Sequence, residues 1–113
     1  MDATYWAPVV DGIGRPVYDK YNQPAFHPPV ELKVFWIDKS ELISGKSGQV
    51  MSRAMVILGD DVSEQGLLYN GTVDSVPAGY RTDPRKFPKA LEIQKFTKIR
   101  TLENDQWYRD ARL

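Results

Sequence analysis

The side chains that could support catalysis are few in this 113-residue sequence, and they do not converge. His27 is the single histidine, and no nucleophile or orienting acid lies close to it in the sequence. The chain has no cysteine, which excludes thiolate nucleophiles, cysteine-ligated zinc and disulfides. Nucleophilic and acid–base catalysis need a base that is oriented toward a nucleophile. The sequence therefore predicts a protein that is not an enzyme and that uses no cofactor or metal.

Two short motifs imitate ligand sites. Residues 45–47 (Gly-Lys-Ser) resemble the end of a phosphate-binding loop, but Ser40 stands where that loop needs its first glycine, and a strand is expected to follow. Residues 59–61 (Gly-Asp-Asp), with Glu64 nearby, form an acidic group. Glycine and aspartate are also the residues that a tight turn requires. We interpret the first motif as a polar turn and the second as a turn between strands.

The net charge is zero, but it is distributed unevenly along the chain. Residues 1–78 hold six Lys/Arg and ten Asp/Glu, a balance of −4, whereas residues 79–113 hold nine and five, a balance of +4. A dedicated DNA-binding domain usually has a clear basic excess, which this chain lacks. A dipolar subunit suits contacts with a like subunit or with charged neighbours.

The elements that position these residues form three regions. Residues 1–29 are rich in aromatics, glycine and proline, and proline blocks regular strand pairing, so we expect an extended N-terminal arm. Residues 30–102 are expected to form the β-domain, and residues 103–113 a C-terminal tail with a helical turn. Aromatic side chains with a polar handle are favoured at protein interfaces. The arm and tail therefore supply the candidate assembly residues, namely Tyr5, Trp6, Tyr18, Tyr21, Phe26, Trp107 and Tyr108.

The β-domain shows the alternation of apolar and polar residues that is typical of strands. Strands are predicted over 30–38, 49–58, 67–69 and 90–102, the last with a β-bulge near Lys95. Asn70-Gly71 predicts a hairpin turn. Polar residues fill the long loops 39–48 and 72–89. This pattern predicts an all-β fold, a small β-barrel or sandwich with long loops.

The order of these elements resembles the head–tail joining family of tailed bacteriophages. The resemblance lies in residues 34–36, a loop with Glu41, Ser-Arg-Ala-Met-Val-Ile at 52–57, Asp-Val at 61–62, Asn-Gly at 70–71 and Ala-Leu-Glu-Ile at 90–93. The opening Tyr-Trp-Ala-Pro at 5–8, with Asp-Gly-Ile-Gly at 11–14, is similar to siphophage members in particular.

The resemblance implies a head-closure, or stopper, protein that is part of the virion neck and is made in the host cytoplasm. Such a protein forms a homo-oligomeric ring, expected here to be six- or twelve-fold, with the portal and adaptor above it and a tail terminator or tail tube protein below. The ring retains packaged DNA and docks the tail. A loop between early strands projects into the channel, and by position it corresponds to residues 39–48. Lys39, Glu41 and Lys46 are therefore candidate channel residues, with possible contact to DNA and none to a membrane.

A second interpretation from another class stays open. Residues 80–89 place Tyr80 and Phe87 among four basic side chains, a composition that can line a nucleic-acid path. On this interpretation the chain is a small nucleic-acid-binding barrel that resembles an OB-fold and binds single strands.

Overall fold

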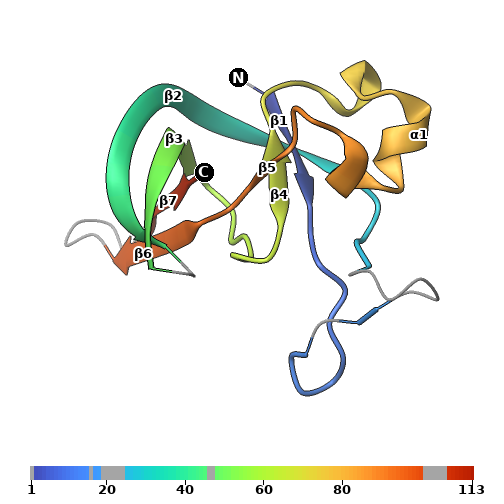
Figure 1. The fold of residues 1–113 in the computed structure, drawn as a ribbon, viewed down its shortest axis with the longest axis horizontal. Coiled ribbons are helices and arrows are strands. Elements are labelled where there is room, and N and C mark those ends of the chain that lie inside the picture. Colours follow the sequence, from blue (N-terminus) through green and yellow to red (C-terminus); the bar gives the residue numbers. More distant parts are fainter. Residues whose placement is uncertain (1, 16, 19–24, 46–47, 101–106) are drawn as a thin grey trace.

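The computed structural model describes residues 2–15, 17–18, 25–45, 48–100 and 107–113. Antiparallel strands dominate these residues, with short helical turns at one end of the molecule (Figure 1). Seven strands are present in the described part of the chain: β1 (Asp2–Trp6), β2 (Val30–Gly45), β3 (Gly48–Leu58), β4 (Leu67–Tyr69), β5 (Leu91–Glu92), β6 (Lys95–Arg100) and β7 (Trp107–Arg112). The all-β fold predicted from the sequence is confirmed.

The strands form one sheet in the order β5-β4-β1-β2-β3-β7-β6, and the long β2 runs through both halves of it. The first residues of β2 pair with β1, and residues 34–45 pair with β3. The two edge strands, β5 and β6, are consecutive in the chain and are separated by Ile93 and Gln94 alone. The Ile93 amide donates to the Gly66 carbonyl (3.2 Å) and the Gln94 amide donates to the Arg112 carbonyl (2.8 Å). This short link joins the two edges, so the sheet curls around one core as a small barrel that is closed by the chain itself, since β5 and β6 do not pair with each other.

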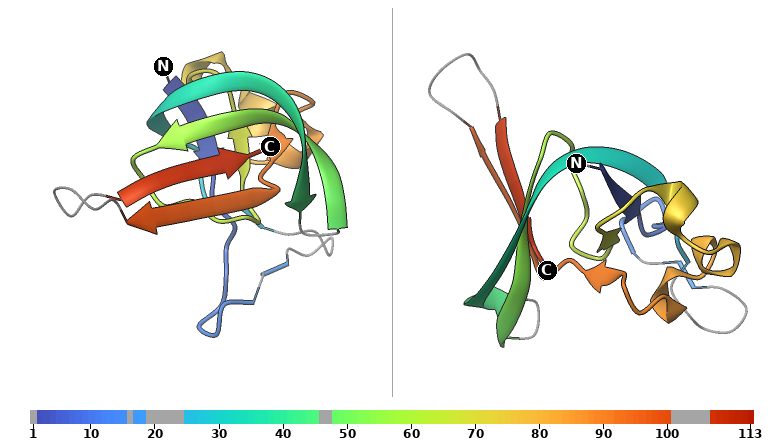
Figure 2. Two further views of the ribbon diagram at one scale, coloured as in Figure 1. Left: turned by 90° about the vertical axis from the view of Figure 1, so that its left-hand side faces the viewer. Right: turned by 90° about the horizontal axis from the view of Figure 1, so that it is seen from above.

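Strand β1 is buried on both faces. Ala3 and Tyr5 pack into the barrel interior beside side chains of β2, β3 and β4, whereas Trp6 on the opposite face belongs to a second cluster. The second cluster is covered by the segment between β4 and β5, residues 72–90, which we call the helical cap. The cap contains 3-10 helices at Val73–Ser75 and Pro84–Lys86 and a short helix α1 (Ala78–Arg81), and it lies at the end of the molecule opposite β6 (Figures 1 and 2).

The boundaries of the expected arm and tail need correction. Residues 2–6 form a central strand of the sheet, so the segment outside the sheet begins after Trp6. The tail is not a helical turn, because residues 107–112 form β7 and pair with both β3 and β6. In both segments the pairing partner is remote in sequence, which local composition does not reveal.

The expected loop over residues 39–48 is also corrected. Strand β2 continues to Gly45 and β3 begins at Gly48, so the two strands form one long hairpin with a register shift between Asp38 and Glu41. The β-bulge allows this polar stretch to stay in the ladder while the hairpin bends. Asn70-Gly71 does not close a hairpin, since the helical cap follows β4.

The strand predicted over residues 90–102 is interrupted in a different way from the expected bulge at Lys95. The break lies at Ile93 and Gln94. Before it the chain pairs with β4 as β5, and after it the chain pairs with β7 as β6, at the other edge of the sheet. Ile93 is fully buried at this corner. The irregular alternation in the sequence therefore marks the point at which the barrel is closed.

Candidate assembly surfaces

The distal half of the β2–β3 hairpin is a two-stranded ribbon. Residues 41–45 of β2 pair with residues 48–52 of β3, and the pairing of β3 with β7 is confined to residues 55–58. Leu42 lies directly opposite Met51, and the two side chains are 61% and 60% exposed. An isolated two-stranded ribbon is only marginally stable in water. A ribbon that exposes an apolar cross-strand pair is a surface on which another chain can pack.

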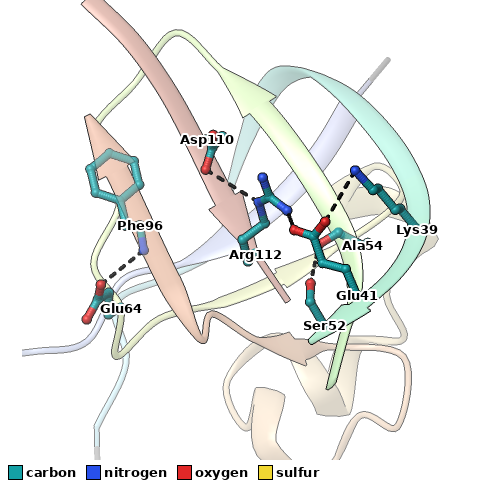
Figure 3. Close-up of polar contacts among 8 residues, drawn as sticks. All are labelled: Lys39, Glu41, Ser52, Ala54, Glu64, Phe96, Asp110 and Arg112. Carbon is teal, nitrogen blue, oxygen red and sulfur yellow. Dashed lines mark hydrogen bonds and ion pairs between the residues drawn. The ribbon is translucent and has the colours of Figure 1, made fainter. Parts of the chain in front are cut away.

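Two of the three candidate channel residues lie in this hairpin, and Lys46 lies outside the described residues. Glu41 accepts ion pairs from Lys39, with 3.2 Å between Nζ and Oε2, and from Arg112 of β7 (Figure 3). Arg112 also approaches Asp110, with 3.7 Å between Nε and Oδ1. The network ties the bulged part of β2 to the last strand. It also neutralises Lys39, which lowers the attraction of that side chain for a phosphate.

Beside this network lies a pocket of about 240 Å3, lined by Glu41, Ile43, Lys95, Thr97, Asp110 and Arg112. Its walls are mainly polar and charged. In the part of the chain that the structure describes, no group of three or more His, Cys, Asp or Glu side chains could hold a metal ion. The ion pairs around this pocket join β2 to β7.

The two N-terminal candidates for the assembly interface are placed elsewhere than expected. Trp6 is fully buried and its Nε1–H donates to the Arg81 carbonyl in the helical cap (3.0 Å). Tyr5 is 7% exposed, and its hydroxyl accepts a hydrogen bond from the Ser63 amide (2.8 Å). Burial raises the pKa of the Tyr5 phenol above its ordinary value. The expectation that these two rings contact a neighbouring subunit is wrong, because they belong to the core of their own chain.

The remaining arm candidates differ from one another. Tyr18 is 55% exposed. Phe26 is half-buried against the second cluster, with the Arg85 guanidinium 5.8 Å from its ring centroid. Tyr21 lies outside the described residues. Tyr18 therefore keeps its place as a candidate contact residue, whereas Phe26 helps to anchor the base of the arm.

The tail candidates lie in β7 near the β6–β7 hairpin end. Trp107 is 46% exposed, and the Lys98 ammonium lies 4.8 Å from its ring centroid. Tyr108 is half-buried. Desolvation and then the neighbouring Asp110 carboxylate raise the pKa of the Tyr108 phenol. Trp107 is thus available for contacts, and Tyr108 is held within the sheet.

Further exposed apolar residues were not among the interface residues predicted from the sequence. Ile13 is 73% exposed at the tip of an arm turn, in which the Asp11 carboxylate accepts hydrogen bonds from the Ile13 and Arg15 amides. Phe35 is 65% exposed on the outer face of β2, and Val10 of the arm is 47% exposed. The consecutive apolar residues Phe35, Trp36 and Ile37 leave no polar face at this end of β2, which is a signal that could have found Phe35. Nothing in the composition of the turn signals Ile13.

Part of the charge difference between the two halves of the sequence is neutralised within the fold. The Asp61 carboxylate pairs with Lys98 (3.2 Å) and Arg109 (2.6 Å), as Glu41 pairs with Arg112. These contacts hold the pKa of Asp61 below its ordinary value, chiefly through the hydrogen bond from Arg109. The uneven charge distribution is therefore less available for contacts between subunits than the sequence indicates.

The alternative nucleic-acid site loses its stacking platform. Phe87 is buried, and its ring packs edge-on against Tyr69 (centroids 5.0 Å apart) and in a stack with Tyr80 (5.3 Å). Aromatic rings bind single strands through free faces. Phe87 belongs to the second cluster of the core, and Tyr69 and Tyr80 are half-buried against it, so the structure does not favour the single-strand interpretation.

Comparisons with known proteins add no assignment. No protein-family model matches the sequence, and no curated protein matches it either. Among the helices in the described residues, none is long and apolar enough to cross a membrane.

Proposed function

We propose that this protein is a structural subunit of a bacteriophage neck, a head-closure protein that forms a ring between the portal–adaptor complex and the tail. Its role is to assemble, to retain packaged DNA and to dock the tail, and it catalyses no reaction. The proposal rests on the resemblance of the sequence to the head–tail joining family and on the surface chemistry of the fold.

The observation that carries the proposal is the position of the exposed apolar side chains. They lie mainly on the arm and on the ends of the two long hairpins rather than over one concave site. Those on the arm are Val10, Ile13 and Tyr18, those on the β2–β3 ribbon are Leu42 and Met51, and those on β6 and β7 are Ile99 and Trp107. Adjacent exposed apolar side chains, such as the cross-strand pair Leu42 and Met51, are typical of surfaces that contact other proteins.

The positions of these elements suit a ring. A heterologous contact joins two different surfaces of like subunits and closes into a ring when the rotation permits. Figure 2 shows the arm leaving the barrel on one side and the β6–β7 hairpin on another, so the chain offers separate surfaces. In the proposed ring the β2–β3 ribbon and the arm pack against the adaptor or a neighbouring subunit.

The proposal is tested on phage heads that were filled with DNA in the absence of this protein. Adding the purified chain should protect the packaged DNA from nuclease and restore tail attachment. Heads that remain nuclease-sensitive and tailless after saturating addition would contradict the proposal.

A further inference from the structure

The helical cap carries a concentrated positive charge on its surface. Residues 78–90 contain four cationic side chains and one anionic side chain, Asp83. Arg81 is used inside the cap, where its Nε–H donates to the Val76 carbonyl (3.0 Å). Arg85, Lys86 and Lys89 are exposed to solvent. Lys86 lies 3.5 Å from Asp83, in a pair that remains 73% exposed on the lysine side.

The three exposed cations stand on a rigid base. The rings of Tyr69, Tyr80 and Phe87 pack against one another beneath the cap, and the Trp6 indole donates to the cap backbone. Tight turns continue through this region, since the amide of Phe87 donates to Pro84 and that of Ala90 donates to Phe87. The cationic groups are therefore presented within five residues on a preorganised surface, which reduces the entropy lost on binding.

The composition of this surface favours phosphate over protein. None of the large exposed apolar side chains lies within residues 70–94, all of which the structure describes. Protein interfaces need an apolar centre and are depleted in lysine, whereas interfaces with duplex DNA are more polar and far more positively charged. The rings of Tyr69 and Tyr80 are half-buried and both pack against Phe87, which leaves little aromatic surface on which single-stranded bases could stack. The exposed cations therefore suit backbone phosphates better than bases.

We propose that the helical cap, through Arg85, Lys86 and Lys89, contacts the phosphate backbone of duplex DNA. The contact expected from the sequence at Lys39 is thereby moved to the cap, because three cations lie within five residues there and the paired Lys86 side chain is 73% exposed, against 51% for Lys39 beside Glu41. The biological role of this contact rests on the proposed function, in which DNA passes through the ring. The binding itself depends only on the cap and is measurable on the free chain.

The test is the salt dependence of binding to a short labelled duplex, measured by fluorescence anisotropy on the full chain. Three neutralised phosphates predict a slope of about −2.7 in a plot of log affinity against log salt, or about a twenty-fold loss between roughly 50 and 150 mM salt. The triple variant Arg85→Gln/Lys86→Gln/Lys89→Gln should lose the slope and bind at least about ten-fold more weakly at the lower salt. The matched control Lys33→Gln/Lys39→Gln/Lys95→Gln should keep the wild-type slope.

Other outcomes overturn the proposal. An absence of duplex binding at low salt, or equal slopes for the cap variant and the wild type, would remove the cap as a DNA surface. If polyglutamate bound as tightly as the duplex, the cap would be a surface for an acidic protein rather than for DNA. If single-stranded DNA bound more tightly than the duplex, the interpretation as a single-strand-binding protein would be favoured instead. Failure to form a ring with the portal–adaptor complex, with the predicted slopes intact, would contradict the connector role and leave the DNA surface standing.

Discussion

At the scale of single residues, the two tryptophans that the sequence predicted at an assembly interface, Trp6 and Trp107, have different roles. Trp6 fills the space between β1 and the helical cap and donates a hydrogen bond to Arg81. Trp107 is 46% exposed and touches Lys98. Both residues lie near an end of the sequence and were therefore predicted to have the same role. The prediction failed for Trp6 because the cap that covers it lies about seventy residues further along the sequence.

The difference between the tryptophans gives a direct prediction. Trp6→Phe should lower the free energy of unfolding by about 1–3 kcal/mol, because the fully buried indole is replaced by a smaller ring and the part-buried Arg81 carbonyl loses its donor. Trp107→Phe should change it by about 0.5 kcal/mol or less. Urea unfolding of the free chain measures both values. Equal and small effects would mean that Trp6 is not packed under the cap.

The Asp61 pair predicts a pH dependence. The cations beside Asp61 hold its folded pKa below the ordinary value of 3.8, so the stabilisation from this group is full above that value and is lost as the pH falls through the folded pKa. The difference in Tm between the wild type and Asp61→Asn should therefore be largest at neutral pH and shrink below about pH 4. A difference that is constant from neutral to acid pH would show that the ion pairs do not form.

At the scale of elements, period-two alternation predicted the strands around 30–38, 49–58 and 67–69, which form β2, β3 and β4. Strands β1 and β7 were missed because each pairs with partners remote in sequence, and because β1 is buried on both faces and lacks a simple polar–apolar alternation. The extent of the β2–β3 hairpin was also missed. Serine, glycine and lysine at residues 44–48 indicated a loop, whereas the ladder continues to Gly45 and Gly48 after a register shift between Asp38 and Glu41.

The β2–β3 ribbon is expected to serve assembly rather than folding. Leu42→Ser/Met51→Ser should leave the Tm of the free chain nearly unchanged, since both side chains are about 60% exposed. The same variant should fail to join the portal–adaptor complex in a pull-down measured by quantitative gel analysis.

A matched variant controls for disturbance of the ribbon itself. Leu42→Met/Met51→Leu keeps the apolar surface and its volume, so it should assemble like the wild type. If the serine variant assembles as well as this control, the ribbon is not an assembly surface.

At the scale of the whole molecule, the fold joins a closed barrel to an arm and two hairpins. The short link between β5 and β6 closes the barrel, and the helical cap covers one outer side of it. The outer face of β2 and β3 stays open and exposes Phe35. The sequence was sufficient to predict the β-class and the strands with clear alternation. It was insufficient for the placement of the site, because exposure depends on which remote segment covers each strand.

The central claim is that the chain forms a ring in the neck, and native mass spectrometry of the full chain mixed with the portal–adaptor complex tests it most directly. The account predicts a single mass increase that equals a fixed number of subunits matching the symmetry of that complex, with a ring visible beneath it in negative-stain images. A chain that remains monomeric and leaves the mass of the complex unchanged would contradict the account.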